Sequence, residues 1–168
     1  MQPRRLLLVR HAKAAAGSID KNRPLTEEGA RRAAAIGSWL AQEEMVPDRV
    51  LVSPARRAAQ TWEQAAASLP SDPQPVFDQR IYDNTAQALL AAIRETPEEV
   101  HMVAVVGHNP SMAELALLLD DGRGAARPRS DIAAGFGTGG VAVFELTTPF
   151  TEIGPGTATL SAYVVPGR

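Results

Sequence analysis

The sequence predicts one α/β domain, a three-layer sandwich with a mostly parallel central sheet flanked by helices. Two observations carry this prediction. Short apolar runs alternate with segments of helical periodicity, and neither an internal repeat nor a low-complexity linker interrupts them. A chain of 168 residues is most simply a single domain, residues 1–168, and is long enough to bury a substantial core.

Two strands and two helices are expected in the first seventy residues. Residues 6–9 are uniformly apolar and residues 49–52 form a second strand-like run. Thr26 suits the N-cap of a helix, and Ser53 with Pro54 suits the N-cap and first position of another. The buried faces of these two helices would carry Ala33, Ile36, Gly37 and Leu40, and then Ala58, Trp62, Ala65 and Leu69.

The middle of the chain repeats this alternation. A proline-rich loop leads to a short extended piece at residues 76–77, and a helical face follows over residues 86–93. Residues 101–106 are the most strand-like run and are apolar enough to be central in the sheet. Asn109 and Pro110 repeat the cap-and-proline signal before a helix whose buried face would carry Met112, Leu115, Ala116 and Leu119.

The last third is expected to end the sheet. Residues 121–140 hold six glycines and are predicted to be a loop. Residues 141–146 and 157–165 read as two final strands, which we expect to pair antiparallel at an edge.

Composition excludes several classes of protein. The net charge is −2 with no long run of one sign, which argues against a nucleic-acid or membrane partner. The absence of cysteine removes disulfides, thiol nucleophiles and thiolate metal sites. Three histidines without HExxH spacing predict no metal site, and no cofactor is expected. The four-residue apolar run near the N-terminus is shorter than the roughly 7–15 residues of a signal peptide core, so we expect a cytoplasmic protein.

Three predicted strands end in groups that resist burial. The first runs into Arg10 and His11, the second into Ser53 with Arg56 close behind, and the third into His108. In an open α/β sheet, ligands collect outside the carboxyl ends of the strands. If the strands are parallel neighbours, two arginines, two histidines and two helix N-termini converge there. Such a pocket fits a phosphoryl-sized dianion, because guanidinium groups match phosphate oxygens and helix N-termini favour anions.

Taken singly, each of these signals is commonplace. A lone histidine after a strand is usually structural, and a lone arginine in a first helical turn is usually solvated. The combination at three strand ends favours a site. His101 has no other candidate site residue near it, so we interpret it as a residue at the start of a strand. We interpret Lys13, Arg31, Arg32 and Arg57 as charged surface residues. Neither a Gly-x-Ser-x-Gly nucleophile motif nor a G-x-x-x-x-G-K-[ST] phosphate loop occurs.

Three motifs carry a resemblance to a known family. RHA after the first strand, SPARRAAQT from residue 53 and GHNP around residue 108 resemble the histidine phosphatase superfamily, also called phosphoglycerate-mutase-like. D-x-x-R-P-L-T over residues 20–26 and the short length resemble its SixA-type phosphohistidine phosphatase branch. The resemblance covers residues 5–118 and is loose beyond them. Ala12 stands where many members have glycine, a difference of one methyl group.

The resemblance implies a fold and a set of roles. The fold would be phosphoglycerate-mutase-like. His11 would be the nucleophile that forms a phosphohistidine intermediate, Arg10 and Arg56 would clamp the phosphoryl oxygens, and His108 would hydrogen-bond them in the transition state. No metal is required, because phosphoryl transfer depends mainly on in-line positioning and on stabilising charge.

The sequence does not identify the residue that donates a proton to the leaving group. Larger relatives usually carry a glutamate after the third strand, whereas the corresponding VFDQRIYDNT stretch has none. Asp20, Asp78 and Asp83 are candidates that the sequence does not rank. Expelling an alkoxide demands a good acid, while a protonated phosphoramidate leaves easily, so phosphohistidine or aryl esters fit better than sugar phosphates.

The expected function is therefore metal-independent hydrolysis of a phosphoryl group from protein phosphohistidine, through a covalent intermediate on His11. Two alternatives stay open: a phosphatase of small phosphorylated molecules, and a non-catalytic module that binds phosphate or phosphohistidine. A short chain leaves little room for a roof between residues 70 and 100, which argues against mutase activity.

Overall fold

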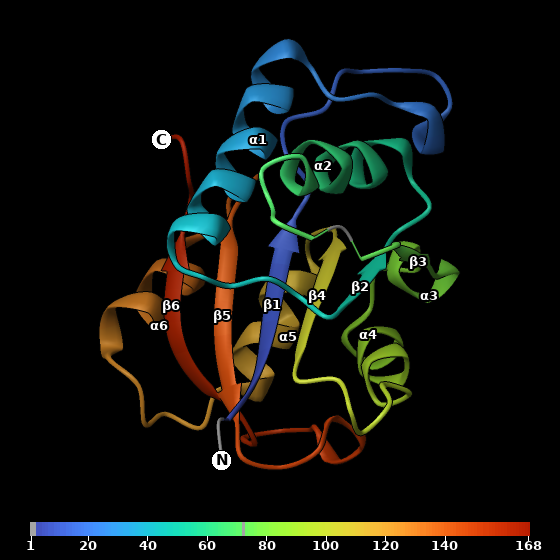
Figure 1. Ribbon diagram of the computed structural model, residues 1–168. Coiled ribbons are helices and arrows are strands. Elements are labelled where there is room, and N and C mark those ends of the chain that lie inside the picture. The colour runs from blue at the N-terminus through green and yellow to red at the C-terminus, as the bar shows by residue number, and fades with distance from the viewer. Residues whose placement is uncertain (1–2, 72) are drawn as a thin grey trace.

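The computed structural model describes residues 3–71 and 73–168, which form a six-stranded sheet with helices on both faces (Figure 1). The strands are β1 (Arg4–Arg10), β2 (Arg49–Val52), β3 (Val76–Phe77), β4 (Met102–Gly107), β5 (Val141–Leu146) and β6 (Thr159–Val164). The helices are α1 (Glu27–Gln42), α2 (Arg56–Ala66), α3 (Gln79–Tyr82), α4 (Ala86–Ile93), α5 (Ser111–Leu119) and α6 (Ala126–Ala134), with 3-10 turns η1 (Asp20–Asn22) and η2 (Phe150–Glu152).

The sheet has the strand order β3-β2-β4-β1-β5-β6. The first four strands in that order are parallel, and β5 runs antiparallel to both β1 and β6. The mostly parallel sheet, the central place of β4 and the antiparallel pair at one edge are all confirmed. Since β2, β4 and β1 are parallel neighbours, their carboxyl ends meet at one edge, at the top of Figure 1.

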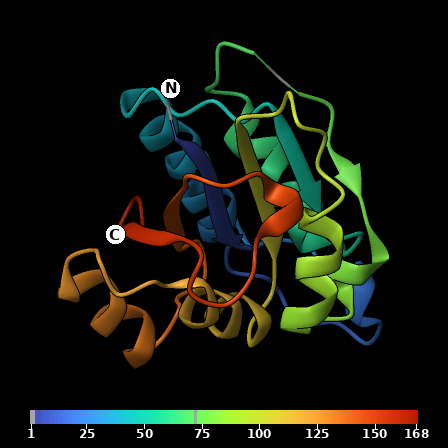
Figure 2. The same ribbon diagram turned by 90° about the horizontal axis from the view of Figure 1, so that it is seen from below.

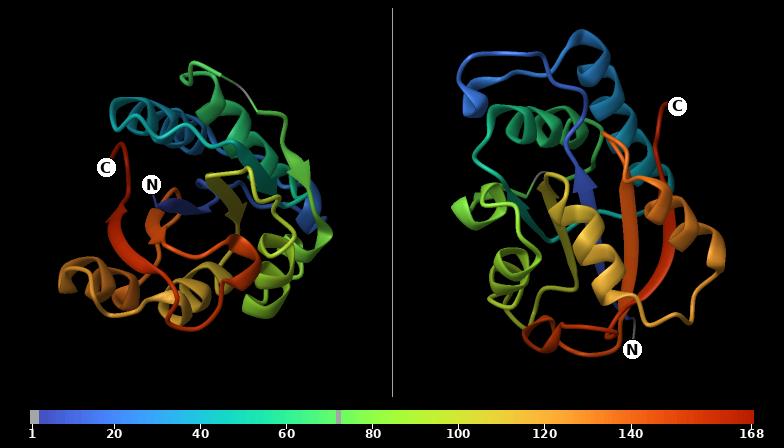
Figure 3. Two further views of the ribbon diagram at one scale, coloured as in Figure 1. Left: turned by 60° about the horizontal axis from the view of Figure 1, so that its bottom comes forward. Right: turned by 180° about the vertical axis from the view of Figure 1, so that it is seen from behind.

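Two hydrophobic layers hold the helices to the sheet. Helices α1 and α2 cover one face, and α4, α5 and α6 cover the other (Figures 2 and 3). Strand β1 feeds both layers: Leu6 and Leu8 belong to the cluster under α4 and α5, while Leu7 and Val9 belong to the cluster under α1 and α2. This period-two alternation of fully buried side chains is what a central strand of a three-layer sandwich requires.

Helix α1 begins where the sequence predicts. The Thr26 hydroxyl accepts a hydrogen bond from the Gly29 N–H at 2.9 Å, as an N-cap does. Further along the helix, Gly37 brings α1 against α2, because a Cβ there would lie 2.0 Å from the Ala65 carbonyl oxygen. Only glycine permits that approach of two backbones.

The start of α2 differs from the prediction. The helix begins at Arg56 rather than at Pro54, and its N-cap is Ala55, so Ser53 is not the cap. The Ser53 hydroxyl oxygen instead accepts from the Ala55 N–H at 3.2 Å, in a turn between β2 and α2. Helix α5 likewise begins one residue late, at Ser111 after Pro110.

Residues 121–140 are not simply a loop. They include α6, whose Pro128 lies in the first turn, where its missing N–H removes no helical hydrogen bond. The glycines that suggested a loop flank this helix rather than interrupt it. Within residues 3–71 and 73–168, no helix is both long and apolar enough to cross a membrane.

Candidate active site

A cavity of about 490 Å³ lies beyond the carboxyl ends of β1 and β4. Its lining residues are Arg10, His11, Lys13, Ala14, Asp20, Arg23, Arg57, Tyr82, Asn84, His108, Asn109 and Thr138. The structure therefore brings Arg10, His11 and His108 together, as the strand order implies. Four cationic side chains and one carboxylate line the cavity, so its local charge is positive although the chain carries −2 overall.

The arginine that α2 contributes is Arg57, not Arg56. Arg57 lines the cavity and is 7% exposed, whereas Arg56 is exposed to solvent. The reason is helical geometry: Arg57, Thr61 and Ala65 share the buried row of α2, and Arg56 lies in a row with Gln60 and Gln64. The spacing of Arg57 from Thr61 and Ala65 is visible in the sequence. The assignment of Arg56 to the pocket and of Arg57 to the surface was wrong.

His11 is held in one tautomer. Its Nδ1 lies 2.7 Å from the carbonyl oxygen of Ala12, and because a carbonyl only accepts, Nδ1 carries the proton. Burial lowers the pKa of His11 to about 4, and the nearby Arg57 and Arg10 add to this effect. The ring is therefore neutral near pH 7, and Nε2 keeps an unshared electron pair.

The acceptor for His11 is itself fixed by α2. The Ala12 N–H donates to the Thr61 hydroxyl at 3.0 Å, and that hydroxyl donates to the Arg57 carbonyl oxygen at 2.7 Å. Ala12 is fully buried, so the structure accommodates its methyl group. One polar chain thus couples the residue after His11 to the helix that carries Arg57.

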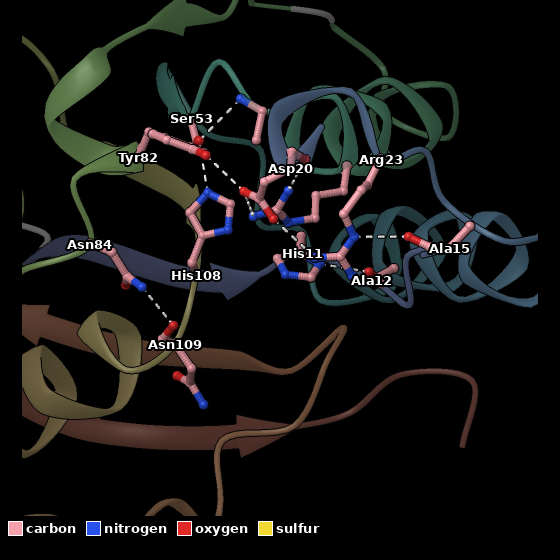
Figure 4. Close-up of polar contacts among 12 residues, drawn as sticks. His11, Ala12, Ala15, Asp20, Arg23, Ser53, Tyr82, Asn84, His108 and Asn109 are labelled. Atoms are coloured by element: carbon pink, nitrogen blue, oxygen red, sulfur yellow. Dashed lines mark hydrogen bonds and ion pairs between the residues drawn. The ribbon is translucent and has the colours of Figure 1, made fainter. Parts of the chain in front are cut away.

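His108 faces His11 across the cavity, with ring centroids 5.3 Å apart. Its Nε2 lies 2.8 Å from the Ser53 hydroxyl oxygen, while Nδ1 is buried and has no hydrogen-bond partner within the described residues (Figure 4). Burial lowers the pKa of His108 to about 3, and the positive charges of Arg57 and Arg10 act in the same direction. Ser53 therefore serves as a side-chain partner of His108 instead of a helix cap.

The segment that follows α6 holds the Arg10 side chain in place. Its Nη1 donates to the Phe136 carbonyl oxygen at 2.8 Å, and the Asn109 side-chain amide donates to the same oxygen at 2.9 Å. Gly139 N–H donates to the carbonyl oxygens of Arg10 and His11. The glycine-rich stretch after α6 thus positions the end of β1.

Asp20 is the one candidate acid that lines the cavity. Its carboxylate accepts from Tyr82 at 2.7 Å, from Arg57 at 3.1 Å and from Arg23 at 3.1 Å (Figure 4). The hydrogen bond from Tyr82, followed by those from Arg23 and Arg57, lowers the pKa of Asp20 to about 2. Near neutral pH this carboxyl is ionised, and it has no proton to donate.

The other two candidate acids lie elsewhere. Asp78 caps α3 and forms an ion pair with Arg80, which lowers the pKa of Asp78. Asp83 is exposed at the end of α3 and accepts from Gln79 at 3.3 Å. Neither lines the cavity, and the described residues that do line it include no glutamate.

The sequence analysis missed several further cavity residues, among them Tyr82 and Asn84. Tyr82 comes from α3, a helix too short to show a period. Asn84 adopts a φ of 65° and donates from its side-chain amide to the Asn109 carbonyl oxygen at 2.7 Å (Figure 4). Asparagine tolerates this left-handed conformation, but nothing in the local sequence indicates its partner.

Fold and site together define an α/β protein with a cationic, two-histidine cavity at the carboxyl edge of its sheet. A model of the histidine phosphatase superfamily (branch 1) matches residues 6–102, more than half of the chain. The chain belongs to this superfamily.

Relatives by sequence and by structure agree with that membership. An uncharacterised protein of Mycobacterium tuberculosis H37Rv is 32% identical over 161 residues, which cover 94% of this chain and 99% of the relative. The phosphohistidine phosphatase SixA of Escherichia coli K12 is 32% identical over 126 residues, covering 70% and 74% of the two chains. A candidate SixA from Nakamurella multipartitia superposes with a TM-score of 0.86 at 28% identity, covering 100% and 99%. A protein histidine phosphatase SixA in complex with tungstate gives 0.79 at 26% identity, covering 96% and 97%.

Proposed function

We propose that this protein is a metal-independent phosphatase that removes the phosphoryl group from phosphohistidine on a partner protein. The observation that carries the proposal is the hydrogen bond from His11 Nδ1 to the Ala12 carbonyl oxygen, which leaves Nε2 unprotonated in a cationic cavity. A neutral imidazole with a fixed tautomer is a prepared nucleophile.

The first step transfers the phosphoryl group to His11. The electron pair on Nε2 forms a bond to phosphorus while the bond from phosphorus to the leaving group breaks, in line with the attack. The low pKa of His11 keeps Nε2 available at neutral pH. Water then attacks the phosphohistidine, releases inorganic phosphate and returns His11 to its resting form.

Three side chains stabilise the charge on the transferring group. Arg10 and Arg57 supply guanidinium N–H groups, and His108 supplies a neutral donor. Among the described residues the Ser53 hydroxyl has no acceptor other than His108 Nε2, so we assign its proton to that contact and the His108 proton to Nδ1. That buried Nδ1–H has no partner among the residues that the structure describes, which supports a role in binding a phosphoryl oxygen.

The missing acid favours phosphoramidates over alkyl esters. An alkoxide leaving group must receive a proton, and the only carboxyl among the described lining residues is ionised, with a pKa of about 2. An imidazole that leaves from a protonated phosphohistidine requires no proton from the enzyme. Similarity to SixA proteins, two of which carry phosphohistidine or histidine phosphatase in their names, supports the same substrate.

A phosphorylated protein is the proposed partner, because short segments border the cavity. The 3-10 turn η1 and the four-residue α3 border it, through Asp20 and Tyr82. A phosphorylated side chain protruding from another protein fits such a site. The cytoplasm, where phosphohistidine relays operate on soluble partners, is the compartment we propose.

Steady-state release of phosphate from a phosphohistidine peptide, glycerol phosphate and p-nitrophenyl phosphate tests the proposal. We expect the highest kcat/KM with the phosphohistidine peptide, the lowest with glycerol phosphate, and no turnover by His11→Ala. Equal hydrolysis of glycerol phosphate and phosphohistidine would contradict the substrate assignment. Binding of the peptide without release of phosphate by the wild type would identify a binding module.

A further inference from the structure

A carboxylate is an unexpected neighbour for a phosphoryl site. Asp20 lines the same cavity as Arg10, Arg57 and His108, and negative charge there weakens the binding of a dianion. A substrate that brings positive charge close to Asp20 would offset this cost. A phosphohistidine ring does so, because the nitrogen that is not bound to phosphorus can carry a proton.

Building on the proposed function, we propose that Asp20 determines specificity by binding the ring N–H of the substrate imidazolium at the leaving-group side of the cavity. Asp20 then acts as a fixed counter-ion for the departing ring and not as a general acid. The proposal concerns the class of leaving group that the site accepts: cationic nitrogen heterocycles rather than alkoxides or phenolates.

The geometry leaves one acceptor position for that contact. Oδ2 of Asp20 receives two donors, from Tyr82 and from Arg57, while Oδ1 receives one, from Arg23. A carboxylate offers about four lone-pair positions, so one position on Oδ1 remains. The Asp20 side chain is 50% exposed, so an incoming ring can reach it.

The residues around Asp20 keep its carboxylate ionised and fix its position. Tyr82 and the two arginines reach it from three segments, namely α3, α2 and the end of η1, and Lys21 lies over the Tyr82 ring at 5.0 Å. Arg57 also donates to the Asp20 backbone carbonyl oxygen at 2.9 Å, which fixes the residue independently of its carboxylate. The low pKa of Asp20 agrees with a permanent anion at this point.

The transfer step balances without a delivered proton. His11 Nε2 supplies the electron pair of the new N–P bond. The old N–P bond breaks and leaves its pair on the substrate ring, so that the imidazolium becomes a neutral imidazole. The ring keeps the proton that it shares with Asp20. A phenolate leaving group would instead develop negative charge beside this carboxylate.

The test compares two substrates in the Asp20→Asn protein, which keeps the size of the side chain and the backbone contact to Arg57. We expect kcat/KM for a phosphohistidine peptide to fall at least tenfold, while kcat/KM for p-nitrophenyl phosphate stays level or rises. The inhibition constant of inorganic phosphate should stay unchanged or decrease. Asp83→Asn, which removes an exposed carboxylate outside the cavity, should leave the ratio of the two kcat/KM values unchanged within about twofold.

Two results would overturn the inference. One is an equal loss for both substrates in Asp20→Asn, and the other is a weaker inhibition by phosphate in step with that loss. Either would mean that Asp20 serves only to orient Arg57. Failure of the proposed function looks different: the wild type would hydrolyse p-nitrophenyl phosphate and leave the phosphohistidine peptide intact.

Discussion

The guanidinium of Arg57 donates to the backbone carbonyl oxygen of Asp20 at 2.9 Å and to its carboxylate at 3.1 Å. These two contacts join α2 to the loop that follows β1. They occupy two of the five N–H groups of the arginine and leave three for a phosphoryl group. The hydrogen bond from Tyr82 lowers the pKa of Asp20 most, and the contact of Arg57 with the carboxylate adds to that effect. Arg57 therefore connects the phosphoryl clamp to the carboxylate that is ionised near neutral pH.

The two adjacent arginines of α2 should differ sharply in their effect on catalysis. Arg57→Ala should lower kcat/KM by about 10²–10³-fold, the loss typical of a donor that stabilises transition-state charge. Arg56→Ala should change it by about twofold or less, because this side chain points to solvent. A comparable loss in both variants, measured at one pH, would contradict the placement of the clamp.

Both cavity histidines should stay neutral well below the usual range of histidine. Burial lowers the pKa of His11 to about 4 and that of His108 to about 3. Long-range ¹H–¹⁵N NMR spectra in phosphate-free buffer should show both rings neutral at pH 5.5, with His11→Gln and His108→Gln as assignment controls. Titration of either ring near pH 6.5 would show that burial does not govern its charge.

The same shifts make stability depend on pH. Below about pH 6.5 the unfolded chain binds protons on these histidines and the folded chain does not, so the free energy of unfolding falls as the pH drops. The loss should continue to about pH 4 for His11 and about pH 3 for His108. Urea unfolding between pH 7 and pH 5 should show this slope, and His11→Gln should reduce it. An identical slope in that variant would argue that other groups cause it.

Thr61 should position His11 without touching the substrate. Thr61→Val removes the acceptor of the buried Ala12 N–H and should cost about 1–3 kcal/mol of stability. The freed Ala12 peptide no longer fixes the His11 tautomer, so kcat should fall by about tenfold with KM little changed. Thr61→Ser keeps the hydroxyl and should restore most of kcat. If Thr61→Ser were as impaired as Thr61→Val, methyl packing and not the hydrogen bond would matter.

Most of the fold follows from patterns within single segments. Apolar runs located β1, β2, β4 and β5, the Thr26 cap located α1, and buried periodicity located α4 and α5. The segment 126–134 was missed because its charge, proline and flanking glycines resemble a loop, although a proline in the first turn is compatible with a helix.

The sequence predicted the site residues only where the order of the strands brings them together. Arg10, His11 and His108 follow parallel neighbours, so their meeting follows from topology. The choice of Arg57 over Arg56 follows from the buried face of α2, because Arg57 lies one turn before Thr61 and two turns before Ala65. The contact of Tyr82 with Asp20 spans 62 residues and leaves no local trace.

The measurement that tests the central claim most directly is trapping of the phosphoenzyme. Wild type and His11→Ala are incubated with a ³²P-labelled phosphohistidine peptide, quenched, and examined under both acidic and alkaline conditions. We predict label on the wild type alone that survives alkali and is lost in acid, the behaviour of phosphohistidine, together with released phosphate. Released phosphate with no label on the wild type, or equal label on His11→Ala, would contradict His11 as the nucleophile.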